Sequence, residues 1–287
     1  MIVLGFEPNH KITNPITNPE GVDVKRLIVA IAVVGVTLPV FALSQDLGRR
    51  LGGENGPRRA TAADRPAPKL PDGKVDLSGV WTGGGDGDIA RLLKPGELDT
   101  IMQPWAKKLY AERNAVDGLD PYFSCMPGGP LRITGGFAWR LVQHPTTNTT
   151  HIFMLQEGNA HTYRQIFMDG RKHPEDPSPT WYGHSIGRWE GDTLVVDTIG
   201  LNDKFWLDPG GTPHTEKLHL VERYTRTEFT TLRREVTVED PGAFTRPFTV
   251  TYTAKLGTPE SEILEYICIE NNQYGLAQGL ALPNTKK

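Results

Sequence analysis

The stretch at 181–202, WYGHSIGRWEGDTLVVDTIGLN, brings together side chains that could do acid–base chemistry. Its two runs of strand-forming residues flank a Gly-centred turn at 190–192, and this pattern predicts a β-hairpin. The first strand contains His184 and the second contains Asp197. A carboxylate beside an imidazole raises the pKa of the ring and fixes its tautomer, which suits the ring to general acid–base catalysis.

The register of this hairpin decides whether the two side chains meet. A two-residue turn that begins at Glu190 sets His184 opposite Asp197, with Cβ atoms about 4.5–5.5 Å apart. The same turn moved on by one residue sets Asp197 opposite Ile186, and a three-residue loop sets it opposite Ser185. A polar ladder on the outer surface of a sheet is the alternative to a catalytic pair.

Two long segments, 169–182 and 201–216, contain further candidates for a small-molecule site. Long loops in compact domains are usually functional. Aromatic side chains offer apolar area to an organic ligand, and an arginine would hold its carboxylate or phenolate through paired N–H donors. Asp-Gly turns, prolines and capping tryptophans equally suit structural loops. We expect catalytic roles for His184, Asp197, Arg171, His214 and Glu216, and substrate-binding roles for Arg188, Asp169, His173, Trp181, Tyr182, Asn202 and Trp206.

Motifs for metals, nucleotides and nucleophiles are weak or missing. His214 and His219 stand five residues apart, and neither HExxH nor a Cys/His finger pattern occurs. A metal site built from His173, His184 and His214 is an alternative, but we expect neither a metal nor a cofactor. A phosphate-binding GxxxxGK[ST] loop is absent, and no helix follows Ser185 as a nucleophile elbow would need. The formal net charge of −3, without a basic stripe, indicates no nucleic-acid partner.

The elements that must position these residues are mainly strands. Strand-forming runs follow one another from residue 131, and the intervals hold no helix long enough for parallel crossovers. We therefore predict a mainly β fold, an antiparallel up-and-down (calycin- or lipocalin-like) β-barrel of about 8–10 strands. One or two helices are expected at 95–116, where Pro104 either kinks a helix or opens a second one. The strands are expected at 75–81, 137–143, 150–156, 161–168, 183–190, 193–200, 217–225, 231–239, 247–255 and 262–269.

The lengths of the connections indicate where a ligand would bind. In an up-and-down barrel, alternate connections lie at opposite ends. Short connections would share one end, at 157–160, 190–192, 226–230 and 256–261. The other end would carry the connections at 144–149, 169–182, 201–216 and 240–246, of which two are long. This predicts a cup that holds one small ligand, with His184 and Asp197 near its mouth.

The N-terminal part does not resemble a folded domain. Two basic residues precede an apolar run at 27–43 that ends in small residues, which predicts a secretory signal peptide at 1–44; an uncleaved membrane anchor is the alternative. The start codon is expected near Val22 or Val24. Residues 45–74 are rich in Gly, Pro, Arg and Ala and predict a disordered linker. The barrel domain would then span 75–287, in a periplasmic or secreted protein.

The chain contains two cysteines, Cys125 and Cys268. In an oxidising compartment they could pair and close a long loop, which stabilises a fold by ~3–5 kcal/mol on the chain-entropy model. Alternatively, Cys268 is a buried thiol within an apolar run. Both interpretations are open at this point.

Four segments resemble a group of secreted bacterial proteins, most of them uncharacterised: DLSGVW at 76–81, WYGHSIGRWEGDTLVVDTIGLND at 181–203, PHTEKLHLVERY at 213–224 and EYICIENN at 265–272. The resemblance covers nearly all of the expected folded part and implies a secreted β-barrel, but it carries little settled chemistry. More weakly, the chain is similar to cofactor-free lyases of lignin-derived aromatic compounds with lipocalin-like barrels. No catalytic residue is carried over from either group.

Together these patterns predict an exported enzyme that acts on a small aromatic or phenolic molecule. Its His/Asp acid–base chemistry would need no cofactor, as in a lyase step such as decarboxylation or dehydration. The alternative is a non-catalytic periplasmic carrier of lipocalin type, and a third option is an envelope interaction module. Membrane contact is expected only through an uncleaved N-terminal segment, and a homo-oligomer is left open.

Overall fold

The described residues all lie in the unit that spans Arg59–Lys287. The expected signal peptide and residues 45–64 of the expected linker lie outside the described residues. The computed structural model describes residues 65–85, 87–115, 120–144, 150–158 and 162–268.

Residues 65–74, expected to be part of a disordered linker, pack on the barrel instead. The carbonyl oxygen of Arg65 accepts a hydrogen bond from the Phe229 N–H at 2.8 Å. Lys69 forms a 2.9 Å ion pair with Asp192. The ordered part of the chain therefore includes residues ahead of the expected boundary at Val75.

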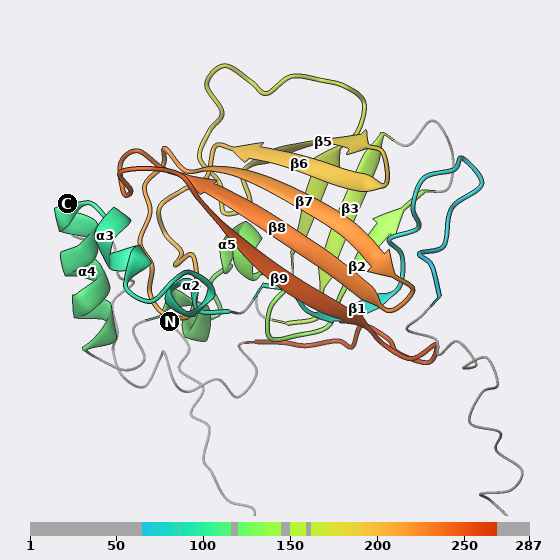
Figure 1. Cartoon of the computed structure of the whole chain (residues 1–287), viewed down its shortest axis with the longest axis horizontal. Coiled ribbons are helices and arrows are strands. Elements are labelled where there is room, and N and C mark those ends of the chain that lie inside the picture. Colours follow the sequence, from blue (N-terminus) through green and yellow to red (C-terminus); the bar gives the residue numbers. More distant parts are fainter. Residues whose placement is uncertain (1–64, 86, 116–119, 145–149, 159–161, 269–287) are drawn as a thin grey trace, which may run out of the picture. The chain divides into compact units, whose positions relative to one another are not determined.

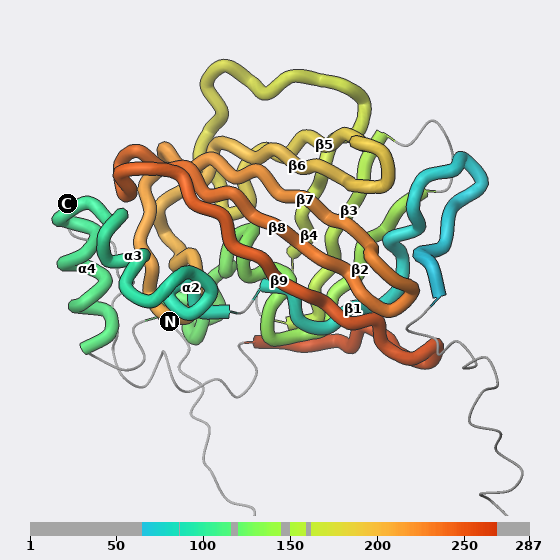
Figure 2. The backbone as a smooth tube through the Cα atoms, in the orientation of Figure 1, coloured from blue at the N-terminus to red at the C-terminus, as the bar shows by residue number. Residues whose placement is uncertain are grey.

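Nine strands within the described ranges form one closed barrel in which consecutive strands are neighbours (Figure 1). Pairing of β9 with β1 closes the ring, and Figure 2 follows the same path as a tube. The predicted mainly β barrel is thus confirmed. The strands are β1 (Val80–Gly83), β2 (Trp139–Gln143), β3 (His151–Gln156), β4 (Tyr163–Phe167), β5 (His184–Glu190), β6 (Thr193–Ile199), β7 (His219–Glu228), β8 (Thr231–Glu239) and β9 (Phe248–Leu256).

One pair of neighbouring strands, β4 and β5, runs parallel. In a closed ring, every pair of neighbouring strands can be antiparallel only if the number of strands is even. A ring of nine strands therefore needs at least one parallel pair. The other eight pairings are antiparallel. The segment that joins β4 to β5, residues 168–183, is called the crossover segment below. Figure 1 shows it arching beside β5 and β6, outside the barrel.

The parallel pair overturns part of the expected arrangement of connections. From β5 to β9 the ends alternate as predicted. On the other side of the parallel pair the two ends of the barrel are exchanged, so β2 ends and β3 begins at the same end as the turn at 190–192. The expectation that these strand ends lie at the end of 201–216 is therefore wrong, and residues 145–149 between them lie outside the described residues.

The strand expected at 262–269 is not formed in its described part, residues 262–268. The short strand β1 occupies the place beside β9, and the N–H of Gly257 donates to the Val80 carbonyl at 2.8 Å. The chain then continues to Cys268, which forms a disulfide bond with Cys125 across a Cα–Cα distance of 5.6 Å. Of the two interpretations of the cysteines, the structure has the paired one.

Short helices precede β2. Within the predicted helical segment 95–116 the structure has α3 (Glu97–Ile101) and α4 (Pro104–Asn114). Pro104 lies in the first turn of α4, where its missing N–H needs no partner, so it opens a second helix rather than kinking one. The other helices in the described ranges are α2 (Ile89–Leu92), the 3-10 helix η3 (Pro121–Ser124) and α5 (Gly129–Arg132).

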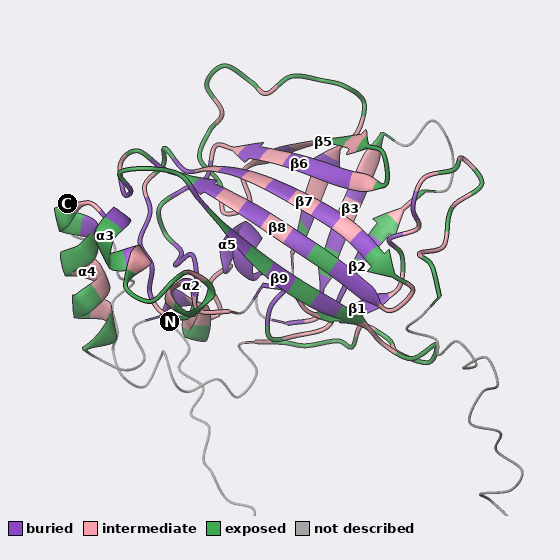
Figure 3. Cartoon of the chain, viewed as in Figure 1, coloured by how far each residue is buried: buried purple, intermediate pink, exposed green. Residues whose placement is uncertain are grey.

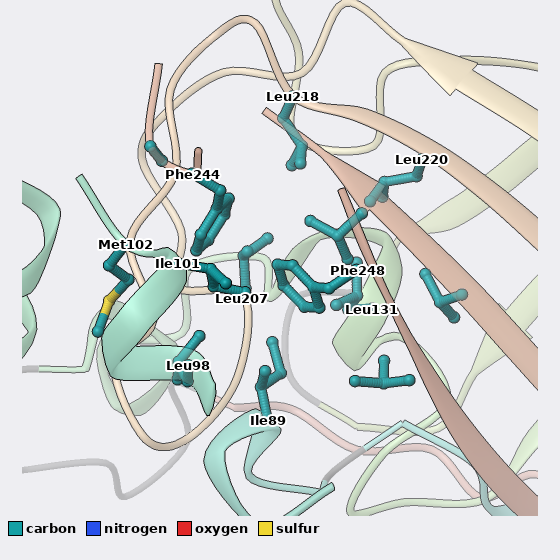
Figure 4. Close-up of a cluster of buried hydrophobic side chains, with 14 of the residues drawn as sticks. Ile89, Leu98, Ile101, Met102, Leu131, Leu207, Leu218, Leu220, Phe244 and Phe248 are labelled. Carbon is teal, nitrogen blue, oxygen red and sulfur yellow. The ribbon is translucent and has the colours of Figure 1, made fainter. Parts of the chain in front are cut away.

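An apolar core fills the end of the barrel that was expected to be an open mouth (Figure 4). Ile89, Leu98 and Ile101 from α2 and α3 pack with Leu207 and Phe248 in one cluster. The segment 201–216 therefore folds into this core rather than over a ligand.

Buried and exposed residues alternate along the strands, as Figure 3 shows for β8 and β9. Period-two alternation places one set of side chains inside the barrel and the other outside. The buried set includes large apolar residues such as Trp81 and Trp139. It also includes charged ones, because Arg164 and Glu222 are inner-face residues of β4 and β7.

Candidate acid–base site

The turn of the β5–β6 hairpin is centred on Gly191 and the residue after it. Gly191 has φ 59°, in the left-handed region that glycine adopts at little cost. This register sets Asp197 opposite Ile186. His184 pairs with Ile199 instead, so the expected direct pairing of His184 with Asp197 is wrong.

His184 and Asp197 lie on the outer face of the barrel. Their chain neighbours Ser185 and Thr198 are fully buried inside it, where both contact Arg164. Because strand residues alternate between faces, His184 and Asp197 point outward. Both are nevertheless half-buried, because the crossover segment lies against this part of the wall.

A single residue of the crossover segment, His173, joins the two. Its Nδ1 lies 2.8 Å from Nδ1 of His184, and its Nε2 lies 3.0 Å from Oδ1 of Asp197. The same aspartate oxygen is 3.0 Å from Nε2 of His219 in β7, whose Nδ1 is 3.3 Å from Oε2 of Glu239 in β8. These five residues form a continuous hydrogen-bonded row, the His–Asp chain.

The hydrogen-bond pattern of the His–Asp chain constrains its protons. The ionised carboxylate of Asp197 only accepts, so Nε2 of His173 donates to it. In a neutral His173 the other nitrogen, Nδ1, then accepts, and Nδ1 of His184 donates. This assignment, made from the network, leaves a lone pair on Nε2 of His184 that can take a proton from a substrate.

The electrostatic surroundings favour neutral His184. Burial lowers the pKa of its imidazole, and the positive charge of the nearby Arg171 lowers it further. A general base must be unprotonated before it acts. His184 therefore fits the role of a base at neutral pH.

An aromatic and cationic surface adjoins His184. The ring of Phe167 in β4 stacks on the imidazole with centroids 5.0 Å apart. The guanidinium of Arg171 lies 3.8 Å from the centroid of the same Phe167 ring. Arg171 is also held by Asp169, with Nη2 and Oδ2 2.5 Å apart, and this hydrogen bond lowers the pKa of Asp169 to about 2. Four of the predicted site residues thus come together, namely His184, His173, Arg171 and Asp169, and Asp197 adjoins them.

Three aromatic residues expected to stack on a ligand pack inside the protein. Trp181 packs against the apolar core beside α2 and α3, and Tyr182 packs against the core inside the barrel. Burial raises the pKa of the Tyr182 hydroxyl. Trp206 is 5% exposed, with the guanidinium of Arg113 4.8 Å from its ring centroid. Their positions give no support to contact with a ligand beside His184.

His214 is buried in the segment before β7, and both of its ring nitrogens face backbone carbonyls. Nε2 lies 3.0 Å from the Phe205 oxygen and Nδ1 lies 3.2 Å from the Thr215 oxygen. Burial lowers the pKa of His214, although both carbonyls favour the charged ring. A neutral ring donates to only one carbonyl. These contacts fix the loop, and they leave neither ring nitrogen facing the His–Asp chain.

Three more predicted site residues lie apart from His184. Asn202 is buried, and its Oδ1 accepts from the Lys204 N–H at 3.1 Å in a local turn. Glu216 is exposed. Arg188 lies four residues beyond His184 on the outer face of β5, where it pairs with Glu190 at 2.7 Å.

Sequence reasoning missed His219 and Glu239 as site residues. His219 stands in a predicted strand, KLHLVERYT, where alternation shows that it shares a face with Val221 and Arg223. Placing it beside Asp197 requires the register between β6 and β7, where Asp197 pairs with Val221. The long segment between these strands hides that register from the sequence.

The inner face holds a second polar group. Glu222 forms ion pairs with Arg164 and with Arg234, whose Nη2 is 2.7 Å from Oε1. The hydroxyl of Tyr224 donates to the same carboxylate at 2.7 Å. Burial alone would raise the pKa of Glu222, but the two guanidiniums outweigh it and hold the pKa at about 2. This carboxylate is therefore ionised in a fully buried place.

The residues that the structure describes contain no group of three or more His, Cys, Asp or Glu side chains arranged to hold a metal ion. The structure gives no support to the alternative metal site that includes His214, because both of its ring nitrogens face backbone carbonyls. Over the same residues, no helix is long and apolar enough to cross a membrane. No protein-family model, curated protein or solved structure matches this chain.

Proposed function

We propose that this protein is an exported enzyme that moves a proton on a small aromatic or phenolic molecule without a cofactor, in a lyase-type step such as decarboxylation or dehydration. His184 acts as the base, through Nε2. His173 holds the tautomer of His184, and Asp197 holds His173. The observation that carries the proposal is the His–Asp chain, which orients a neutral imidazole beside an aromatic ring.

The surface beside His184 suits an aromatic acid. The ring of Phe167, whose faces the His184 imidazole and the Arg171 guanidinium already cover, would contact the ring of a substrate through its edge, since edge-to-face aromatic pairs are favourable. Arg171 is exposed, and the described hydrogen bonds use its Nε and Nη2 but not Nη1. Nη1 would therefore bind a carboxylate or phenolate without the loss of the Asp169 contact.

A carrier of lipocalin type has less support. Such a protein keeps its ligand inside the barrel. Here the inner face presents Trp81, Trp139 and Tyr224, all fully buried, and the Arg164–Glu222 ion pair. These side chains fill space that a drug-sized ligand would need.

The test begins with native mass spectrometry of the protein purified from its own host, which would identify a retained organic molecule. A panel of phenolic and hydroxycinnamic acids related to that molecule is then assayed for loss of carbon dioxide or water. Replacement of a general base costs about 10²–10⁴-fold in rate. His184→Asn should therefore lower kcat by at least 100-fold, with little change in KM.

Two exposed arginines provide a matched comparison. Arg171 and Arg188 each pair with a carboxylate two residues away, Asp169 and Glu190. Arg171→Met should raise KM, because it removes the anion-binding group beside His184, whereas Arg188→Met should leave kcat and KM unchanged. Full turnover by His184→Asn, or equal effects of the two arginine variants, would contradict the proposal.

A further inference from the structure

The interior of the barrel contains more positive than negative charge. Arg164 and Arg234 are each 1% exposed, and both contact the one carboxylate of Glu222, which is 0% exposed. The described contacts of the two guanidiniums include no second carboxylate. A charge without a counter-charge is costly away from water.

Arg234 has good oxygen acceptors for both of its Nη atoms, whereas Arg164 has them for only one. Arg234 donates to backbone carbonyls and a hydroxyl at 2.6–2.9 Å, in addition to Glu222; these acceptors belong to Gly84, Pro130, Leu131 and Thr134. The N–H groups of Arg234 are thus well satisfied. The unbalanced charge is therefore best assigned to Arg164.

One edge of the Arg164 guanidinium lacks a good acceptor. Nε donates to the Ser185 hydroxyl at 3.1 Å, and Nη2 donates to Thr198 at 2.7 Å and to Glu222. The described partner of Nη1 is the thioether sulfur of Met154 at 3.8 Å, which is a weak acceptor. The missing negative charge belongs beside Nη1.

A second buried donor lies on the neighbouring strand. Gln156 is 9% exposed, and its Nε2 has no hydrogen-bond partner among the described residues. Met154 is opposite Arg164 in the β3–β4 register. Gln156 follows two residues later on the same inner face, so it is the diagonal neighbour of Arg164 and within reach of a long side chain. A buried amide N–H without an acceptor needs an explanation.

We propose that a small anion binds inside the barrel between Nη1 of Arg164 and Nε2 of Gln156. The anion supplies the missing negative charge and accepts from both donors. Large side chains such as Trp139 and Tyr224 occupy the same interior, so the ligand is a chloride ion or a one- or two-carbon carboxylate. This site is on the inner face, on the other side of the barrel wall from the His–Asp chain, and it does not rest on the proposed function.

Thermal melting of the full chain at constant ionic strength tests the site. Sodium gluconate, whose anion is too large for this place, is exchanged stepwise for sodium chloride, formate or acetate. A ligand that binds only the folded state raises the melting temperature along a saturating curve. We expect a rise of a few degrees, and the order of the three anions shows whether a halide or a carboxylate is preferred.

Two substitutions at one position make the test specific. Gln156→Leu removes the donor and should weaken the response to anions at least tenfold. Gln156→Glu places a carboxylate beside Arg164, so it should abolish the response without lowering the melting temperature in gluconate. Gln165→Leu, on the outer face of β4 opposite Phe153, is the control and should respond like the wild type.

Two results would overturn the site. One is a melting temperature of the wild type that does not change between gluconate and the small anions. The other is a rise of equal size in all four proteins, which would be a general salt effect.

Discussion

Replacing Glu222 by Gln tests whether the buried ion pairs stabilise the barrel. Glu222 accepts from Arg164, Arg234 and the Tyr224 hydroxyl, and none of its surface is exposed. The amide keeps the shape but removes the charge, which leaves two guanidiniums facing each other without a carboxylate. Breaking a buried ion pair in this way costs roughly 3–5 kcal/mol.

The pKa of Glu222 leads to a similar magnitude. It falls from the ordinary value of 4.5 to about 2, which corresponds to roughly 3 kcal/mol of stabilisation of the ionised form in the folded state. Because the folded-state pKa lies below the unfolded-state value, this contribution is fully present above pH 4.5. It is lost as the pH falls from 4.5 through about 2.

The assay is urea denaturation of the oxidised full chain, followed by tryptophan fluorescence at neutral pH and at several acidic values. Glu222→Gln should lower the free energy of unfolding at neutral pH by roughly 3–5 kcal/mol and the melting temperature by about 6–20 °C. Its stability should also fall less than that of the wild type between pH 4.5 and 2.5. Glu190→Gln, which removes an exposed carboxylate paired with Arg188 and Arg223, is the control and should change little. A Glu222→Gln protein within about 1 kcal/mol of the wild type, the size of an average substitution, would refute the reasoning.

Three further predictions concern the backbone, the disulfide and a buried histidine. Gly183→Ala should lower stability by ~1–3 kcal/mol, because φ is 64° and the new Cβ would lie 2.5 Å from the Ile199 oxygen. Gly191 also has a positive φ but has open space around it, so the difference in melting temperature between Gly183→Ala and Gly191→Ala measures the steric contribution to the loss of stability. Reduction of the Cys125–Cys268 bond, which spans 143 residues, should cost up to roughly 5 kcal/mol on the chain-entropy model, and equal melting temperatures with and without reductant would contradict this. The lowered pKa of His214 predicts stability that is present above pH 6.5 and lost below it, as the unfolded chain takes up the proton first; His214→Gln should flatten that slope in denaturation curves.

The barrel was predictable because its strands are local patterns. Alternation and turn residues mark β2 to β9 to within a few residues, and Pro104 marks the start of α4. Strand pairing over long separations is not local. The strand-forming composition of residues 262–268 suggested a ninth long strand, yet the four residues of β1 take the place beside β9. Competition between two segments for one edge cannot be read from either segment alone.

The candidate site was predictable in its residue types but not in its geometry. The assumption that all strands alternate in direction placed His184 at an open mouth of the barrel. A closed ring of nine strands instead requires one parallel pair, and the crossover segment that joins this pair lies over the outer wall. His173 reaches His184 for that reason. The charged inner residues were overlooked because Arg164 and Glu222 resemble ordinary solvent-facing positions in a strand. Their burial is explained by the ion pair that they form inside the closed barrel, which the sequence does not reveal.

The barrel is closed by a strand pair whose members lie far apart in the chain, since Trp81 of β1 pairs with Leu256 of β9. A chain that is still being made can form the β5–β6 and β7–β8 hairpins early, because their strands are adjacent in sequence. It cannot complete the ring until β9 has been synthesised. Until then β8 and β1, the two strands that pair with β9, each leave one edge of unpaired backbone groups open to other chains. Aggregation during synthesis, rather than loss of stability after folding, is therefore the expected result of truncation ahead of β9.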